Sequence, residues 1–329
     1  MSSYPDDEFG LITRYFGNVG GSDEPLSDSP VISLGIGDDC AILRTPPGYE
    51  MCLSIDTLVS GVHFPETITP YNLGYRCLAV SLSDLAAMGA QPVAFTLALT
   101  LPDNNGEWLD AFSRGLSKLA SEHCIRLVGG DTTKGPLTIS VQVHGIVPEG
   151  QAIKRSGARP GDLICVSGAL GDAGAALKYL HLESDIDTVS GNIRRFLSRY
   201  FSPQPRIELG CVLRGLATAA IDISDGLLAD LNHILTSSGV GALLHEDKIP
   251  CSSELISECG SRSLSLALTA GDDYELCFCL PGSVYEHLRA EPWFASVSVI
   301  GVVSNESGIR IERKDGDKCV LSPDGYKHF

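Results

Sequence analysis

The feature that most constrains this chain is an aspartate that repeatedly follows an apolar segment. At Gly35-Ile36-Gly37-Asp38-Asp39-Cys40, two glycines and two adjacent carboxylates interrupt an apolar run, and the next cationic residue is Arg44. Adjacent carboxylates repel one another unless a cation neutralises them. The arrangement of apolar segment and aspartate recurs five more times, at Leu53–Thr57, Val80–Asp84, Leu127–Thr133, Ile221–Gly226 and Thr269–Asp273.

Six acidic segment ends without an adjacent cation predict a shared group of divalent ions. Carboxylates are the hard oxygen ligands that Mg²⁺ binds, and a polyphosphate would complete the coordination. Each aspartate alone also fits a simpler role, because Asp and Ser cap helices and Asp-Gly and Gly-Asp pairs form turns. For Ser224-Asp225-Gly226 both capping and metal binding fit the sequence, and the two roles can coexist. The number of such segments favours shared metal over independent caps.

The glycines beside these aspartates fit the same interpretation. Gly35, Gly37, Gly129 and Gly130 would let backbone N–H groups approach phosphate oxygens, although turn geometry alone also favours glycine. Gly35-x-Gly37 lacks the third glycine of a dinucleotide-binding fingerprint, and neither a Gly-x-x-x-x-Gly-Lys-Ser/Thr loop nor a protein-kinase signature occurs. The sequence therefore predicts phosphate binding outside these common motif classes.

Composition narrows the class of partner. The net charge of −17 over 329 residues argues against nucleic acid, and it allows phosphorylated ligands where divalent metal reverses the local sign. The 11 scattered cysteines, without a Cys-x-x-Cys pair, indicate buried thiols in a reducing cytosol rather than disulfides or zinc. The acidic start is unlike a signal peptide, and the longest apolar region, 78–101, is broken by Asp84, Gly89 and Pro92. We therefore expect a cytoplasmic protein with no membrane segment.

Hydrophobic periodicity predicts a two-domain α/β (α+β) protein. Helices are expected at 8–16, 71–87, 107–121, from 173 onward, at 205–217 and from 224 or 225 to 235, with a loop at 18–30. Strands are expected at 31–36, 40–44, 51–55, 93–101, 125–129, 137–147, 163–167, 219–223, 276–280 and 297–303. The segment 147–162, which contains Pro and Gly, is expected to join an N-terminal domain, 1–148, to a C-terminal domain, 149–329.

Taken together, these motifs make the chain resemble the thiamine-monophosphate kinase family over nearly its whole length. The matching segments are Gly35–Ala41, Asp56–Val59, His63-Phe64, Ser83–Ala90, Gly129–Thr133, Arg155–Asp162, Ile221–Gly226, Asp273–Phe278 and Gly325–Phe329. That family belongs to the aminoimidazole-ribonucleotide-synthetase-like superfamily. The resemblance implies an N-terminal domain that binds metal and ATP and whose strands pair across a homodimer into a barrel. It also implies a C-terminal α/β domain that closes over nucleotide and substrate.

The resemblance further implies site residues. Several Mg²⁺ ions would be held by Asp39, Asp56, Asp84, Asp131, Asp222 and Asp225, with Ser54 and the backbone carbonyl of Ile55 as further oxygen donors. ATP would be bound by Gly130, Asp131, Arg155 and Ser224, and thiamine monophosphate by His63, Asp272 and Pro323. Three positions depart from the family pattern. Ile55 replaces a frequent Thr, Asp272 replaces a frequent Glu, and Pro323 replaces an aromatic residue that would stack on the thiamine rings. Apart from the resemblance, a lone His is more often structural, and Arg155 also fits a solvated linker charge.

The implied reaction is Mg²⁺-assisted, in-line transfer of the ATP γ-phosphate to thiamine monophosphate, in thiamine diphosphate biosynthesis. The acceptor is a phosphate monoester with a second pKa of about 6, so it needs no general base. Two other superfamily enzymes are alternatives. A selenophosphate synthetase is expected to carry a reactive Cys or selenocysteine together with a Lys within residues 1–30, and a hydrogenase-maturation carbamoyl dehydratase is expected to end in Cys. This sequence has neither feature. A non-catalytic nucleotide or thiamine-phosphate sensor is a third alternative, but it would not need to retain Asp39, Asp84, Asp131 and Asp222.

Overall fold

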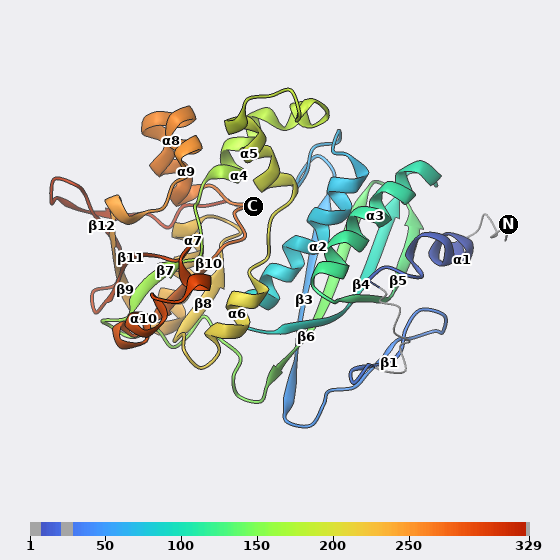
Figure 1. The fold of residues 1–329 in the computed structure, drawn as a ribbon, viewed down its shortest axis with the longest axis horizontal. Helices are drawn as coiled ribbons and strands as arrows, with labels where there is room; N and C mark the ends of the chain where they lie inside the picture. The colour runs from blue at the N-terminus through green and yellow to red at the C-terminus, as the bar shows by residue number, and fades with distance from the viewer. Residues whose placement is uncertain (1–7, 21–28, 327–329) are drawn as a thin grey trace. The chain divides into compact units, whose positions relative to one another are not determined.

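The computed structural model describes residues 8–20 and 29–326 (Figure 1). Most of the loop predicted at 18–30, and residues 327–329 of the terminal motif, lie outside the described residues. The chain divides into two compact units, the first made of Met1–Leu85 and Ala90–Gly150, the second of Ala86–Gly89 and Gln151–Phe329. Within the described ranges, no helix has both the length and the hydrophobicity that crossing a membrane requires.

The first unit is built on a four-stranded sheet with two long helices on one face (Figure 1). The strand order is β3-β6-β4-β5; β6 is antiparallel to both β3 and β4, whereas β4 and β5 are parallel. Its main elements are β3 (Tyr49–Val59), α2 (Pro70–Ala87), β4 (Gln91–Leu101), α3 (Gly106–Glu122), β5 (Arg126–Lys134) and β6 (Thr138–Pro148). Short elements precede them: α1 (Glu8–Leu11), a π-helical turn (Ile12–Phe16), and a ribbon of β1 (Ile32–Leu34) and β2 (Ile42–Leu43).

The two helices of this unit are in direct backbone contact. A Cβ added to Gly74 of α2 would lie 2.1 Å from the carbonyl oxygen of Phe112, and one added to Gly115 of α3 would lie 1.9 Å from that of Tyr71. No larger residue fits at either position. At the start of α3, the side chain of Asn105 accepts hydrogen bonds from two backbone N–H groups of the first turn. These contacts fix α2, which carries one of the predicted metal ligands, against its neighbour.

The second unit is a seven-stranded sheet with order β13-β12-β9-β11-β7-β10-β8, antiparallel except between β12 and β9. Its strands are β7 (Leu163–Val166), β8 (Ala219–Asp222), β9 (Gly241–His245), β10 (Leu276–Leu280), β11 (Ser298–Ser304), β12 (Gly308–Glu312) and β13 (Lys318–Leu321). Its α-helices are α4 (Asp172–Ala176), α5 (Gly191–Phe201), α6 (Ile207–Leu213), α7 (Leu227–Ser238), α8 (Ser253–Cys259), α9 (Ser263–Thr269) and α10 (Gly282–Leu288). Buried apolar side chains of β7 to β12 and of α7 and α9 form the core.

The predicted two-domain α/β architecture is confirmed. Three of the aspartates, however, lie within a strand or helix and not at its end. Strand β3 continues to Val59 and contains Asp56, strand β5 continues to Lys134 and contains Asp131, and Asp84 lies within α2. The expectation that these aspartates follow the ends of apolar segments is therefore wrong. For Asp56 and Asp131 the reason is that a polar side chain does not interrupt the hydrogen-bonded ladder of an edge strand, so β3 and β5 continue past them. Asp84 lies inside the helix expected at 71–87, before its end. The sequence pattern also does not predict α5, α8 or α9.

Candidate active site

Asp56 and Asp84 form a carboxylate pair in the first unit. Asp56 lies on β3 and Asp84 on α2, and the hydroxyl of Ser54 donates a hydrogen bond to the Asp84 carboxylate. Burial, together with the charge of Asp84, raises the pKa of Asp56 from 3.8 to about 6, although a hydrogen bond from Ser81 opposes the rise. Oδ2 of Asp56 is buried and receives no hydrogen bond from the described residues. A divalent cation would satisfy this oxygen and remove the repulsion, so the donors fit Mg²⁺.

Ile55 lies between Ser54 and Asp56 in β3, but its side chain does not contribute to the pair of Asp56 and Asp84. Successive side chains of a strand point to opposite faces, so Ile55 lies opposite Ser54 and Asp56. Its side chain is 62% exposed. Metal binding through its backbone carbonyl stays a prediction.

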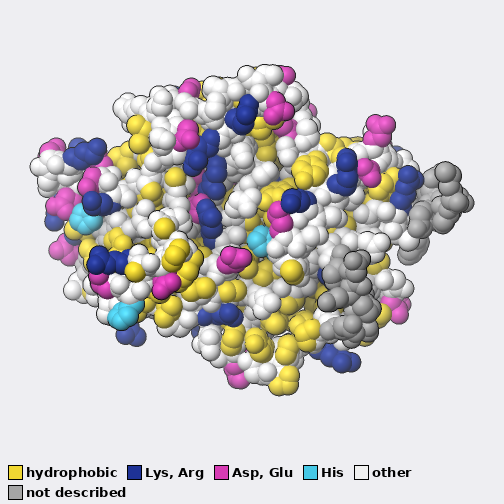
Figure 2. All heavy atoms as spheres, viewed as in Figure 1, with side chains coloured by type: hydrophobic (Ala, Val, Ile, Leu, Met, Phe, Trp, Pro, Cys, Tyr) yellow, Lys and Arg dark blue, Asp and Glu magenta, His cyan; other side chains and the backbone are white. Residues whose placement is uncertain are grey.

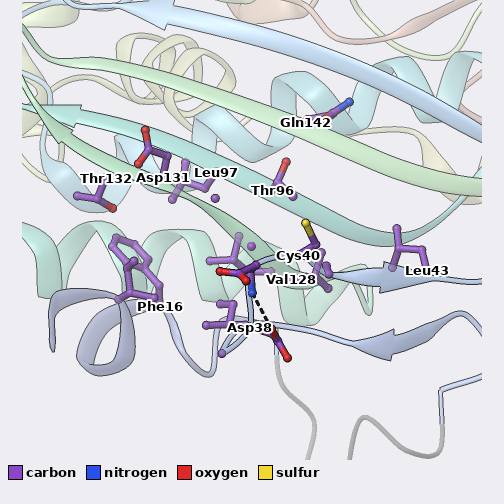
Figure 3. A pocket seen from close by; sticks show the side chains of 18 of the residues that line it. Phe16, Asp38, Cys40, Leu43, Thr96, Leu97, Val128, Asp131, Thr132 and Gln142 are labelled. Carbon is purple, nitrogen blue, oxygen red and sulfur yellow. Dashed lines mark hydrogen bonds between the residues drawn. The ribbon is translucent and has the colours of Figure 1, made fainter. Parts of the chain in front are cut away.

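A pocket of about 790 Å³ in the first unit is lined by three other predicted residues, Asp39, Gly130 and Asp131. Asp131 lies on β5, whereas Asp39 lies on the loop before β2, where its N–H donates to Oδ1 of Asp38 at 2.9 Å. Figure 3 shows Asp38 and Cys40 on this loop and Asp131 and Thr132 on the strand. The lining combines carboxylates and glycines with apolar side chains. Such a mixture suits a ligand with both charged and flat apolar parts.

Gly130 is required by strand packing. Its φ is 155°, and an added Cβ would lie 1.9 Å from the carbonyl oxygen of Leu97 on the neighbouring strand β4. At Gly129, by contrast, the nearest atom would be the methyl group of Thr96 at 3.9 Å. The close packing of β4 and β5 therefore explains Gly130 but not Gly129. The close approach of phosphate to both glycines stays a prediction.

The two acidic groups of the first unit lie at opposite edges of its sheet. Asp56 is on β3 and Asp131 on β5, with β6 and β4 between them. Three inter-strand spacings place their backbones roughly 14 Å apart. Among residues 8–20 and 29–326, no three His, Cys, Asp or Glu side chains approach closely enough to hold one metal ion. The first unit of one chain therefore does not gather Asp56 and Asp131 around one metal ion. Strand order, which separates β3 from β5, is the reason.

In the second unit, Asp222 ends strand β8 and leads into the loop that carries Ser224 and Asp225. Helix α7 follows with Gly226 as its N-cap, so the N-cap residue has no side chain to accept a capping hydrogen bond, and neither Ser224 nor Asp225 accepts one. The interpretation of Ser224 or Asp225 as a helix cap is therefore wrong. Instead, the N–H groups of residues 224, 225 and 226 donate to Oδ2 of Asp230 at 3.0, 3.0 and 3.1 Å. Burial raises the pKa of Asp230 to about 7, a rise that these N–H donors oppose.

The loop that carries Asp272 packs against this one through its backbone. The N–H of Asp272 donates to the carbonyl oxygen of Ser224 at 2.9 Å, and that of Tyr274 to the carbonyl oxygen of Ile223 at 2.8 Å. Asp272 and Tyr274 have φ values of 68° and 48°, which residues other than glycine rarely adopt. The Tyr274 hydroxyl also donates to Oδ1 of Asp272 at 3.1 Å. Two backbone hydrogen bonds therefore hold the strained Asp272 loop against the Ser224 loop, and the Tyr274 hydroxyl binds the Asp272 carboxylate.

The C-terminal segment reaches the same loop. Pro323 is exposed just beyond β13, and three residues later the N–H of Tyr326 donates to the carbonyl oxygen of Asp225 at 3.0 Å. Pro323 has no aromatic ring, and its contact with substrate stays a prediction. The residue whose backbone contacts the loop is Tyr326, an exposed aromatic residue to which the motifs assign no role.

His63 and Arg155 lie in different units. His63 is half-buried in the turn after β3, and its Nδ1 accepts the N–H of Val59 at 3.0 Å, so in the neutral ring Nε2 carries the proton. Arg155 has an exposed side chain, and its carbonyl oxygen accepts a hydrogen bond from Ser238 at 3.3 Å. Their ligand contacts stay predictions.

A buried ionic network beside these loops is not predicted from the sequence. The carboxylate of Glu275 is 2% exposed and accepts hydrogen bonds from Arg199 at 2.8 Å, from Arg206 at 2.7 Å, and from Ser167. Although burial alone would raise the pKa of Glu275, these hydrogen bonds and the two guanidinium charges lower it. Figure 2 shows basic side chains gathered near α4 and α5. Four arginines lie within residues 194–206 of a chain whose net charge is −17. This local excess of positive charge is the sequence signal that could have indicated the network.

Comparison with known proteins first defines a class. Residues 37–147 match the family described as AIR synthase related protein, N-terminal domain, and residues 159–314 match AIR synthase related protein, C-terminal domain. The chain thus has both domains of the AIR synthase related proteins, which confirms the expected superfamily and its mixed α/β fold.

Individual relatives then define the family within that class. The thiamine-monophosphate kinase of Salmonella typhimurium (strain LT2) is 46% identical over 326 residues, which cover 98% of each chain. The crystal structure of thiamine-monophosphate kinase from Stenotrophomonas maltophilia K279a is 41% identical with a TM-score of 0.81, over 88% of this chain and 93% of that one. A structure of AaThiL complexed with AMPPCP and TMP is 31% identical with a TM-score of 0.78, over 100% and 99%. The chain belongs to the thiamine-monophosphate kinase family.

Proposed function

We infer that this protein transfers the γ-phosphate of ATP to thiamine monophosphate, forming thiamine diphosphate and ADP. The observation that carries the inference is the similarity to a thiamine-monophosphate kinase over 98% of both chains. A related structure contains AMPPCP, an ATP analogue, together with TMP. The paired carboxylates of Asp56 and Asp84 give this chain a donor set suited to phosphoryl transfer.

Mg²⁺ would be held by Asp56, Asp84 and Ser54, and by Asp39 and Asp131 at the pocket. When bound, Mg²⁺ supplies the positive charge that neutralises the phosphate oxygens and brings the two anionic reactants together. The buried, unpaired Oδ2 of Asp56 supports this assignment. Because Ser54, Asp56, Asp84 and Asp131 lie on strands and a helix, their oxygens need little reorganisation when ligands bind.

The reaction requires no side chain as general base. The acceptor phosphate has a second pKa of about 6 and is largely a dianion near pH 7. His63 agrees with this, because its Nδ1 accepts the N–H of Val59 and is therefore occupied. We assign it to donate a hydrogen bond to the substrate.

Residues of the second unit complete the assignment. Asp222 and Asp225 would bind further Mg²⁺, and Arg155 and Ser224 would bind the phosphates of ATP. Asp272 and Pro323 would contact the thiamine, at positions where Glu and an aromatic residue are frequent in the family. The strained backbone at Asp272 supports its role, since strain of this kind persists where the surrounding structure enforces it.

We further propose that the first unit forms a homodimer whose two sheets close into a barrel. Edge strand β3 is 11 residues long, and on the face opposite Asp56 its Leu53 and Ile55 are 58% and 62% exposed. A long edge strand with exposed apolar side chains favours pairing with another strand. With the two-fold axis along the barrel, β3 of one copy lies beside β5 of the other. This would bring Asp56 of one copy towards Asp131 of its partner.

The function is tested by ADP formation in the presence of Mg²⁺, with and without thiamine monophosphate. We expect turnover that requires thiamine monophosphate and yields thiamine diphosphate. Binding of both ligands without turnover would support the sensor. ATP consumption at the same rate with and without thiamine monophosphate would support another enzyme of the superfamily.

The composite site is tested by mixing two variants, Asp56→Asn and Asp131→Asn. Each alone should lose orders of magnitude in rate while keeping its fold. If each active site uses Asp56 of one chain and Asp131 of the other, random exchange of subunits restores about a quarter of the activity. A mixture that forms heterodimers yet stays inactive contradicts the composite site, and a monomeric protein contradicts the dimer.

A further inference from the structure

The backbone of the loop between β8 and α7 is held by the protein at nearly every polar group. Ile223 donates its N–H to the carbonyl oxygen of Glu275, and its own carbonyl oxygen accepts the N–H of residue 274, each at 2.8 Å. The carbonyl oxygens of Ser224 and Asp225 accept N–H groups of residues 272 and 326, at 2.9 and 3.0 Å. Two separate segments of the chain therefore bind the carbonyl side of the loop.

The remaining N–H groups of the loop converge on one atom. Ser224, Asp225 and Gly226 all donate to Oδ2 of Asp230, whose residue is 3% exposed. A helix start is usually satisfied by the side chain of the residue before it. Here the acceptor comes from within the first turn of α7. The hydroxyl of Ser224 and the carboxylate of Asp225 are therefore not consumed by capping.

We propose that Asp230 is a positioning residue, which holds this loop so that the side chains of Ser224 and Asp225 are presented to ATP and its divalent cation. The proposal rests on the proposed function for the identity of the ligand. The geometry distinguishes Asp230 from an ordinary buried acid, because all three of its donors belong to the segment that carries the assigned ligand contacts. Its carboxylate sets the direction of three consecutive peptide groups, and with them the directions of the side chains between them.

A matched control is available in the same unit. Asp162 is also buried and accepts a backbone N–H, that of Arg159 at 2.9 Å, and the hydroxyl of Thr218 at 2.7 Å. None of these partners is assigned to the ligand. Asp162→Asn should therefore lower thermal stability, as loss of any buried carboxylate contact does, without changing ligand affinity.

The test compares Asp230→Asn with Asp162→Asn by two measurements that need no turnover. The first is binding of Mn²⁺ in the presence of AMPPCP, followed by electron paramagnetic resonance. The second is hydrogen exchange of the amides of residues 224–226 in the metal-free protein. For Asp230→Asn we expect roughly tenfold to 100-fold weaker binding, as for other residues that orient metal ligands, and faster exchange of the three amides. Asp162→Asn should change neither.

Unchanged Mn²⁺–AMPPCP affinity or unchanged amide exchange in Asp230→Asn overturns the proposal, and so does an equal loss of affinity in Asp162→Asn. If Asp230→Asn does not fold, Asp230→Glu takes its place, because it keeps the charge but displaces the oxygen. Weaker binding at a nearly unchanged Tm then supports the proposal, and unchanged binding contradicts it. An unaltered protein that binds Mn²⁺–AMPPCP but does not phosphorylate thiamine monophosphate would refute the proposed function and leave the test of Asp230 intact.

Discussion

Replacing Asp56 with Asn should stabilise the metal-free protein while removing most of its activity. Burial and the charge of Asp84 raise the pKa of Asp56 from 3.8 to about 6. An acid whose pKa is higher in the folded state stabilises the fold below its unfolded pKa, and this contribution is lost as the pH rises through the folded pKa. The charged carboxylate should therefore destabilise the metal-free protein increasingly between about pH 4 and 6. A rise of about two pKa units corresponds to roughly 3 kcal/mol at pH 8.

An asparagine has no charge, and its amide oxygen can still accept the hydrogen bond from Ser81. Since 1 kcal/mol shifts Tm by about 2–4 °C for a domain of this size, Asp56→Asn should raise Tm by roughly 6–12 °C at pH 8 and by much less at pH 4.5. The assay is thermal unfolding of the metal-free protein at both pH values, repeated with Mg²⁺. Mg²⁺ should stabilise the unaltered protein more than the variant, because only the unaltered protein has both carboxylates.

The matched control is Asp110→Asn, which removes an exposed carboxylate paired with Arg114 on α3 and should change stability by less than about 1 kcal/mol. Either of two results for Asp56→Asn would refute the reasoning. One is a metal-free variant no more stable than the unaltered protein at pH 8. The other is a stabilisation of the same size at both pH values, which would show that the charge of Asp56 is not its cause.

Three further predictions concern packing and assembly. Glu275→Gln should lower the free energy of unfolding in urea by about 3 kcal/mol, because the partly buried guanidinium groups of Arg199 and Arg206 lose the anion that they share. The exposed Glu286→Gln is its control, and similar losses in both variants would contradict the network. Gly130→Ala should disrupt β5 and weaken AMPPCP binding, because its Cβ would clash with the backbone of β4. Gly129→Ala, whose Cβ has room, should have a far smaller effect, and equal effects of the two variants would contradict the claim that strand packing requires Gly130. Ile55→Lys should shift the protein to monomers in size-exclusion chromatography without unfolding it, and a dimer that survives would speak against the β3 interface.

The elements with strong periodicity could be predicted from the sequence. The helix expected at 107–121 is α3, whose buried side chains recur at helical spacing. The strand expected at 276–280 is β10, a continuous apolar run that is buried at all five positions. The ends of β3 and β5 could not be predicted. A polar residue in an edge strand interrupts the hydrophobic pattern without ending the hydrogen-bonded ladder, so Asp56 and Asp131 lie within strands that the pattern ends too early.

The candidate site divides in the same way. The residue types and their motifs indicate hard oxygen ligands, phosphate and the kinase family, since these depend on short stretches of chain. The tertiary structure decided that Asp56 pairs with Asp84, that Asp131 lies at the opposite edge of the sheet, and that Asp230 rather than a neighbouring cap holds the loop of Ser224. These facts depend on strand order and on contacts between segments distant in the chain. No local pattern of residues encodes which carboxylate reaches which partner once the sheet has formed.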